Sequence, residues 1–468
     1  MTTYGDFPGV QVTTAGGGIT AVAIGDEENL VIFGEAQYAR SGQFTDTLSA
    51  DTADGLESSL NASIQTPEQI NARSEADTLF GDGSELANAM KEALANGANI
   101  DYLYGVAVER YLQQDVESSQ TGTLSNTPIY EDTDEIVWTD DSTELTVEFT
   151  YDGEPTTPTD ADTVYLNPLT GQYAADTSPS VDFEVDYRSL DYKSAFEDSA
   201  VQNTVIENET GIFVALSDSD AVSSDLETEV SNMRQDYKLV NALNGAEPND
   251  VEEVLDESEQ RVRFDARYDT VGYSSANQSI DADYYFKLAP VRKDGIKDTV
   301  LGGVGGLFAG NPINDPIYND ALNGYESLEQ TFSKSDADNM REEHIIPIRQ
   351  AGSIRVKDNL STSTETDWER DFWRRRITDR VILIANTVGN DIIGRINDEQ
   401  TRNSAERQIE AEIRSLVDDR LLRSNADGEN WFVDVYESST EADQVNIDIG
   451  FTPYGVVKRI DATVTINT

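Results

Sequence analysis

The side chains in this sequence that could carry chemistry do not form a known reactive motif. The glycine-rich run at residues 302–306, followed by Gly310, is similar to a phosphate-binding loop. However, no Lys-Ser or Lys-Thr pair follows it, and Phe308 occupies the last glycine position of the dinucleotide-binding pattern. We therefore expect a turn that leads into a short helix, and no nucleotide site.

The other catalytic and metal-binding candidates are equally weak. The sequence has no cysteine, and His344 is its single histidine, so thiol chemistry and cysteine- or histidine-based zinc sites are excluded. Carboxylate pairs such as Asp140–Asp141 and Asp218/Asp220 could hydrolyse glycosides, but their proximity carries little information in a chain with 89 acidic residues. We expect no catalytic residue, no cofactor and no metal site, and a protein that is not an enzyme.

The charge balance excludes several classes of partner. The 468 residues include 33 basic and 89 acidic side chains, which gives a net charge of −56. A field of this sign repels polyanions, so we expect no binding to nucleic acid. The basic side chains are 9 lysines and 24 arginines. Few lysines under a coat of carboxylates indicate adaptation to molar salt, although an ordinary acidic protein stays an open alternative.

The charge is also distributed unevenly. Residues 341–468 contain 17 basic and 24 acidic side chains, a net charge of −7, whereas residues 1–340 contain 16 and 65, a net charge of −49. Facing carboxylates repel one another when an interface excludes water. The last 128 residues are therefore predicted to form the association surface of the protein.

No segment predicts membrane insertion. The longest apolar run, at residues 300–310, is too short to cross a bilayer, which needs about 20 residues. The first residues lack the basic and apolar regions of a signal peptide. We expect a soluble protein made in the cytoplasm.

The first two-thirds of the chain predict an α/β domain with an insertion. A strand at residues 29–34, a helix around 86–94 and a strand at 100–108 indicate an α/β unit. A strand at 211–216 and a helix at 230–243 continue it. Between them, alternating strands at 135–138, 145–149 and 181–187 indicate an inserted β subdomain that the α/β core does not need.

The last third has the most regular pattern. Apolar side chains at helical spacing predict helices at 373–392 and 405–421. Alternating apolar residues predict strands at 431–436 and 445–451 and a final strand, with Ile460, Ala462, Val464 and Ile466 on one face. The opening segment alternates in the same way at Val10 and Val12. Neither end has a local partner, which suggests strand addition to a neighbouring subunit, with pairing inside one subunit left open.

Short motifs spread along the chain form an ordered set. They are Phe7-Pro-Gly-Val-Gln-Val12, Asn29-Leu-Val-Ile-Phe-Gly-Glu-Ala36, Asp283-Tyr-Tyr-Phe-Lys-Leu-Ala-Pro290, the run 301–310, Ile354-Arg-Val356, the helix start at 368–380 and Phe451-Thr-Pro453. Together they resemble the tail sheath proteins of contractile phage tails and related contractile injection systems. The resemblance covers both ends and most of the middle but omits 114–190. Lys357 stands where the family has a tryptophan.

The resemblance implies a multidomain α+β or α/β fold with a sheath-like C-terminal α+β domain whose terminal strands are swapped. The implied parts are an N-terminal linking arm (1–28), an outer α/β domain (29–113 and 191–335), an inserted β-rich subdomain (114–190) and an inner C-terminal domain with a linking strand (336–468). It also implies a structural subunit of a contractile tail sheath, located in the virion tail or in an injection particle and assembled in the host cytoplasm at high salt.

The family's functional surfaces carry over to three sets of residues. The linking arms would be Phe7, Pro8, Gly9, Val10 and Val12 with Lys458, Ile460, Ala462, Val464 and Ile466; the receiving sheet would be Val433, Val435, Val445, Ile447 and Ile449; and the tube contact would be Arg407 and Arg414. The implied partners are further copies of the chain, a tail tube protein, and baseplate and tail terminator proteins. An acidic surface-lattice or binding protein and a carboxylate-based hydrolase stay as alternatives.

Overall fold

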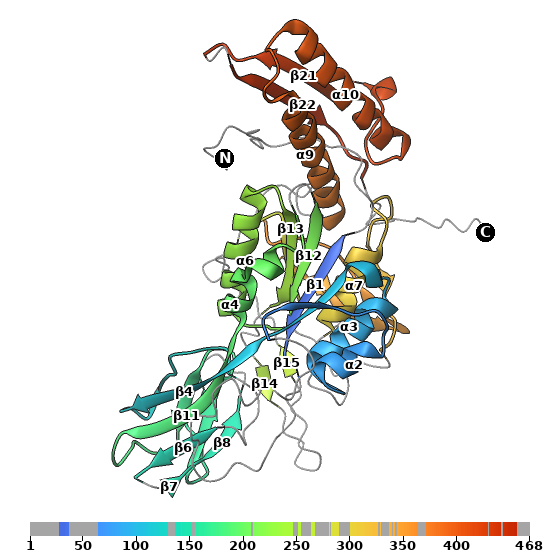
Figure 1. Cartoon of the computed structure of the whole chain (residues 1–468). Helices are drawn as coiled ribbons and strands as arrows, with labels where there is room; N and C mark the ends of the chain where they lie inside the picture. The colour runs from blue at the N-terminus through green and yellow to red at the C-terminus, as the bar shows by residue number, and fades with distance from the viewer. Residues whose placement is uncertain are drawn as a thin grey trace, which may run out of the picture.

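The computed structural model describes three parts arranged along one axis (Figure 1). Its described residues are 28–36, 64–129, 136–141, 143–150, 155–206, 209–246, 251–253, 264–266, 280, 282–289, 300–325, 328, 337–338, 340–341, 344–363, 371–428, 430–440 and 443–455. We call the middle part the central domain. The insert is the β-rich part between β3 (Leu103–Ala107) and α4 (Tyr192–Glu197), and the C-terminal lobe is residues 371–455. No described helix has the length and apolar character needed to cross a membrane.

The central domain is built on a seven-stranded sheet. Its strand order is β18 (Ile345–Ile346), β16 (Tyr285–Leu288), β13 (Leu239–Gly245), β12 (Thr210–Ala215), β1 (Asn29–Gly34), β3 (Leu103–Ala107) and β2 (Pro67–Gln69). All neighbours run parallel except β2, which is antiparallel to β3. Because β1 and β3 are parallel with a helix between them in the sequence, the predicted α/β unit is confirmed.

Helices cover both faces of this sheet. Leu30 and Ile32 of β1 pack in one core with α2 (Glu75–Phe80), α3 (Glu85–Ala95) and α7 (Leu301–Gly310). On the opposite face, Val31 and Phe33 pack with α4 (Tyr192–Glu197) and α6 (Asp220–Gln235), and the short α5 (Ser199–Gln202) follows α4. Both faces are buried, so the strands carry nearly continuous apolar runs.

The glycine-rich run is itself helical, so the predicted short helix is present and includes the residues that were expected to form the turn. All ten residues of α7 are helical, and the helix lies directly against α3. A side chain at Gly302, Gly306 or Gly310 would collide with the backbone of α3 or of Gly97, which ends that helix. These glycines therefore allow two backbones to approach more closely than any other residue would. The close packing outweighs the poor helix propensity of glycine.

The predicted helix at 230–243 is wrong in its second half. Helix α6 ends at Gln235, Tyr237 adopts a positive φ of 58°, and residues 239–245 form the fully buried strand β13. A short apolar run shows no alternation when both faces of its strand are buried, and it then cannot be distinguished from helix by periodicity.

The insert is a two-sheet structure with its own core. One sheet has the order β4 (Glu109–Glu117), β11 (Phe183–Asp191), β6 (Val137–Asp140), β7 (Thr143–Glu144), and the other β5 (Thr121–Thr123), β10 (Gln172–Ala175), β9 (Thr163–Leu166), β8 (Thr146–Phe149). Trp138, Tyr173, Phe183 and Tyr187 are fully buried between them. The predicted strands of this region are thus present, and a nine-pair ladder between β4 and β11 joins the insert to the central domain.

The insert also contacts the central domain beyond this ladder. The hydroxyl of Ser219, at the start of α6, donates a hydrogen bond of 3.2 Å to the carbonyl of Leu169 in the β9–β10 turn. Both residues are buried. A separate two-stranded sheet, β14 (Val251–Glu253) with β15 (Phe264–Ala266), completes this half of the chain.

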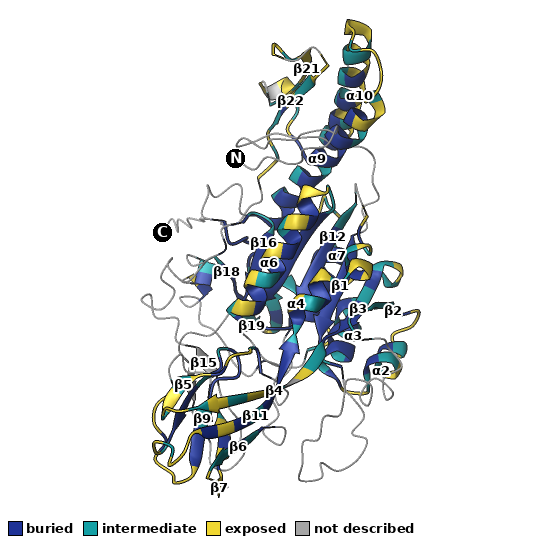
Figure 2. Cartoon of the chain, turned by 60° about the vertical axis from the view of Figure 1, so that its left-hand side comes forward, coloured by how far each residue is buried: buried dark blue, intermediate teal, exposed yellow. Residues whose placement is uncertain are grey.

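The C-terminal lobe consists of two long helices and a hairpin. As predicted, α9 (Phe372–Ile392) and α10 (Glu399–Asp418) are followed by β21 (Trp431–Glu437) and β22 (Val445–Phe451). Figure 2 shows α9 buried along most of its length and α10 exposed along one side. The hydrophobic cluster of the lobe includes Trp373 at the start of α9 and also Leu239 of β13.

The strands before this lobe pack elsewhere. β19 (Ile348–Ala351), β20 (Ser353–Val356) and β17 (Asp320–Ala321) form a small sheet whose isoleucines and valine belong to the core of the central domain. The domain boundary predicted at residue 336 therefore precedes strands that pack on the central domain.

Candidate functional site

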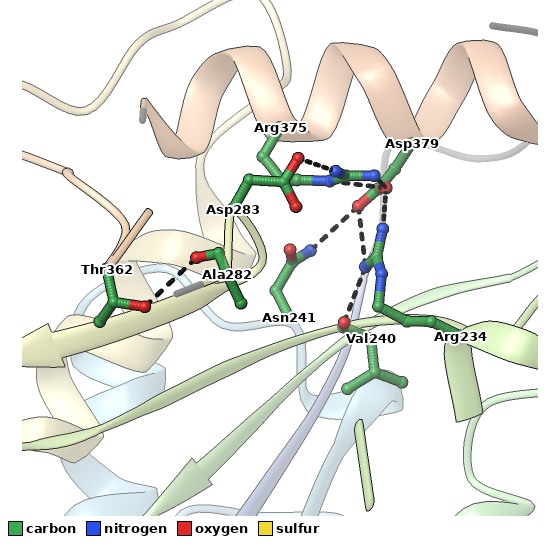
Figure 3. A network of polar contacts seen from close by, with 8 residues as sticks. All are labelled: Arg234, Val240, Asn241, Ala282, Asp283, Thr362, Arg375 and Asp379. Carbon is green, nitrogen blue, oxygen red and sulfur yellow. Dashed lines mark hydrogen bonds and ion pairs between the residues drawn. The ribbon is translucent and has the colours of Figure 1, made fainter. Parts of the chain in front are cut away.

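The first turns of α9 join the C-terminal lobe to the central domain through a buried ionic network (Figure 3). Asp379 accepts hydrogen bonds from Arg234 of α6 and from Arg375 one turn earlier, and both arginines are almost completely buried. Arg375 also pairs with Asp283, which lies just before β16. Burial opposes ionisation of Asp379, but Arg234 and Arg375 outweigh this effect and lower its pKa. The network therefore favours the charged, paired state.

A second buried pair lies beside the first. Arg376 Nε is 2.7 Å from Glu28 Oε1, in the residue before β1, and Arg376 Nη1 donates to the carbonyl of Asn311 at 2.7 Å. Trp373 Nε1 donates to the carbonyl of Ile313, also at 2.7 Å. Burial raises the pKa of Glu28, and Arg376 offsets only part of this rise. The arginine run at the start of α9 thus pairs with carboxylates of the same chain.

These contacts lie at one end of the sheet. Glu28, Asp283 and Val240 stand at or near the amino ends of their strands. In doubly wound α/β sheets, ligands bind at the opposite, carboxyl edge, where the strand order reverses. The amino edge is therefore a junction between parts of the protein, formed by residues far apart in the sequence, and sequence reasoning missed it.

The protein's own side chains occupy part of the carboxyl edge. The strand order reverses between β1 and β12, where Leu216 occupies the space beside Gly34. Asp218 lies against Gly245, and Leu169 of the insert covers the start of α6. Among the described residues, Leu216 and Asp218 thus occupy space at the edge where this fold class holds nucleotides.

The weak catalytic candidates have local structural contacts. Asp140 accepts hydrogen bonds from Ser180, and Asp220 pairs with Lys287. His344 adopts a φ of 64°, and its Nδ1 lies 3.3 Å from the carbonyl of Thr362. Among the described residues, no group of three or more metal-ligating side chains is gathered.

The hairpin brings all five predicted receiving residues onto one face. Val433 is opposite Ile449 and Val435 is opposite Ile447, while Val445 follows at the hairpin end. Val435 and Ile449 are buried against the helices, and the other three are half-buried. Within the described part of the chain, each strand has a neighbour on one side only. A two-stranded hairpin is marginal by itself, so this is a sheet that could take further strands.

Helix α10 carries the two arginines of the predicted tube contact on its outer face. Both Arg407 and Arg414 are exposed. Arg414 pairs with Glu410 at 2.8 Å and lies over the Trp431 ring, whereas Arg407 has no ion pair among the described residues. The fully exposed positions of α10 from 400 to 415 include no acidic residue, in a chain of net charge −56. The absence of acidic residues from this stripe of the helix could have been recognised in the sequence but was missed.

The two predicted linking arms lie outside the described residues. Phe7, Pro8, Gly9, Val10 and Val12 precede residue 28, and Lys458, Ile460, Ala462, Val464 and Ile466 follow residue 455. Their role as strands added to neighbours stays a prediction.

Comparison with known proteins identifies the fold. No family model and no curated protein matches the sequence. The helical sheath of the anti-feeding prophage in its contracted state is similar at a TM-score of 0.56 and 11% identity, covering 99% of this chain and 100% of that one. A chain of the anti-feeding prophage baseplate is similar at a TM-score of 0.56 and 12% identity, covering 99% of this chain and 100% of that one. The contracted PVC sheath complex of an extracellular contractile injection system gives 0.52 and 14%, covering 100% and 99%. Over its whole length, the chain therefore has the fold of contractile sheath proteins.

Proposed function

We propose that the chain is a structural subunit of a contractile sheath that polymerises around a tail tube and contracts to drive the tube through the envelope of a target cell. The observation that carries this proposal is the full-length likeness to sheath chains in the contracted state.

Subunits would be joined by strand addition to the C-terminal hairpin. The arms at 7–13 and 457–467 alternate apolar and polar residues, as a strand lying on α9 and α10 requires. The side chains of Val433, Val445 and Ile447 are only half-buried, so the apolar face of the hairpin is itself partly open. An added strand on either side would cover it.

Assembly of the purified protein tests the function directly. In molar KCl, the full chain is expected to form hollow tubes visible by negative-stain electron microscopy. Deletion of residues 1–14 is expected to leave folded monomers, because the donated strand is lost. Full-length protein that stays monomeric across a wide range of salt and protein concentrations would contradict the proposal.

A pair of hairpin variants separates strand addition from general assembly. Val433→Asp places a charge on the helix-facing side and is expected to prevent tube formation. Asp434→Ser, one residue further on the opposite, exposed face, is the matched control and is expected to assemble normally. Equal assembly of the two variants would remove the hairpin from the proposed interface.

The tube would be contacted by the acid-free outer face of α10, through Arg407 and Arg414. Charge reversal of both arginines is expected to abolish co-assembly with tube protein while empty sheath tubes still form. Arg423→Glu, an exposed arginine outside the helix, is the control. The remaining partners would be baseplate and tail terminator proteins at the two ends of the sheath.

The charge supports assembly at high salt in a haloarchaeal virus or an injection particle. A non-contracting surface lattice of a halophile is the alternative, and the two differ in one measurement. A sheath is expected to appear in two lengths with different helical parameters, whereas a lattice keeps one.

A further inference from the structure

The starting point is where the N-terminal segment meets the folded chain. Glu28 is the first described residue after 1–27, and β1 begins at the next position. β1 lies between β3 and β12 in the centre of the sheet and is buried at all six residues. The segment therefore joins the folded chain at a strand in the buried centre of the central sheet.

Glu28 is bound directly to α9. Its carboxylate lies 2.7 Å from Arg376 Nε, and only 7% of Glu28 and 4% of Arg376 is exposed. Arg376 is itself fixed by the carbonyl of Asn311 and by the ring of Phe372, 5.7 Å from its guanidinium carbon. Arg376 is thus held by three contacts, and Glu28 is held by burial and by Arg376.

The same helix supports the hairpin. Phe372, at the start of α9, stacks on Phe308 in the core of the central domain. Further along the helix, residues from Trp373 to Val388 share one hydrophobic cluster with Val435 and Ile449. The base of the N-terminal segment and the hairpin are therefore connected by one continuous 21-residue helix.

The ion pair between Glu28 and Arg376 differs energetically from the neighbouring network around Asp379. The pKa of Asp379 is lowered by its arginines, whereas the pKa of Glu28 is raised by burial. A buried pair whose desolvation cost exceeds its attraction contributes orientation more than stability. Replacing both members by apolar residues of similar size is then expected to leave the fold about as stable as before.

We propose that Glu28 and Arg376 are a positioning pair that fixes the direction in which the N-terminal segment leaves the subunit, relative to the hairpin that receives a neighbour's strand. The proposal rests on the proposed function, in which residues 7–13 are donated. A fixed exit direction preorganises the donated strand and raises its effective concentration at the neighbouring hairpin.

The test uses the full chain carrying Glu28→Leu with Arg376→Met. Monomer thermal unfolding is expected to stay within a few degrees of the wild type, while the protein concentration needed for tube formation rises about tenfold or more, because preorganisation is lost. Glu28→Gln with Arg376→Gln keeps a hydrogen bond between the same positions and is expected to restore assembly. Asp77→Leu with Lys91→Met removes an ion pair between α2 and α3 and serves as the control.

The outcomes separate the two proposals. Wild-type protein that forms no tubes overturns the proposed function itself. If the wild type assembles and the Leu/Met variant assembles at the same concentration, the positioning role is wrong. A Leu/Met variant whose monomer unfolds well below the wild type assigns the pair a stabilising role and also overturns the inference.

Discussion

The insert and the C-terminal lobe handle charge in opposite ways. Residues 111–187 of the insert contain 18 acidic side chains and not one lysine, arginine or histidine. Residues 371–455 contain 17 acidic side chains and 10 arginines, and four of these arginines, Arg374, Arg375, Arg376 and Arg380, are buried or half-buried in the first turns of α9. Residues 111–187 can relieve their repulsion only through dissolved ions, because the arginines of the insert, Arg110 and Arg188, lie outside this range. The lobe instead neutralises part of its charge with its own arginines.

This difference indicates what each region is for. A region that carries charge of one sign throughout is suited to contact with solvent and unsuited to contact with an identical copy. A region that pairs its charges internally and leaves an acid-free helix face and a two-stranded sheet exposed is suited to protein contacts. The two regions lie at opposite ends of the central domain (Figure 1).

The largest expected effect tests whether the insert folds as a unit. Trp138→Ala removes a fully buried ring that contacts Tyr173 and Phe183, and is expected to destabilise the insert by about 3–5 kcal/mol. Limited proteolysis should then cut the insert while the other two parts stay intact. Uniform digestion of the whole chain would show that the insert has no stability of its own.

A similar loss of stability is expected from a substitution in the C-terminal lobe, at the other end of the molecule. Asp379→Ala leaves Arg234 and Arg375 buried without their shared partner, at a cost of about 3–5 kcal/mol by denaturant unfolding. Lys193→Ala removes an exposed pair with Glu197 at 4.0 Å and is the control, with an expected change of about 0–1 kcal/mol. Similar losses in the two variants would refute the structural importance of the junction.

The insert and the C-terminal lobe should respond differently to salt. Lowering KCl from molar to ~0.1 M lengthens the screening distance to about 10 Å, so repulsion within the insert increases. Hydrogen exchange is expected to speed up first in the insert and last in the buried junction of α9. Exchange that rises equally in both regions would contradict the comparison.

The smallest effect is a difference in pH response. Asp379 has a lowered pKa, so its contribution is complete above the pKa of an unfolded aspartate and is lost as pH falls through the folded value. Burial and a hydrogen bond to Asp115 raise the pKa of Tyr187 to about 12, so its contribution is complete below pH 10 and is lost as pH rises toward 12. Thermal unfolding should show that the junction is destabilised in acid and the insert in alkali. Asp379→Asn should remove the acid response alone.

Periodicity predicted the elements that have one solvated face. Helix α10 and strands β21 and β22 were located from apolar spacing, because their buried and exposed positions alternate regularly. The apolar spacing also located α9, although most of its residues are buried. The same reasoning failed at β13, which is buried on both faces, and placed part of a helix there.

The features that were not predicted from the sequence depend on partners that are distant in the chain. The close packing of α7 requires Ala89 and Ala93 of α3, about 200 residues away. Arg234 and Asp379 are 145 residues apart, and Glu28 and Arg376 are 348 apart. An arginine run at a helix start signals charge pairing, but only the fold determines which carboxylates are its partners.

The ladder between β4 and β11 has a consequence for engineering. Glu109 and Asp191 are direct partners in it, so the chain leaves and re-enters the central domain at nearly one point, with Cα atoms about 5 Å apart. A foreign domain whose own ends are equally close could replace the insert without stretching either strand. Such a graft must also supply a hydrogen-bond acceptor for Ser219 in place of Leu169. Each subunit would then carry one cargo domain, and an assembled tube would display it at every lattice position.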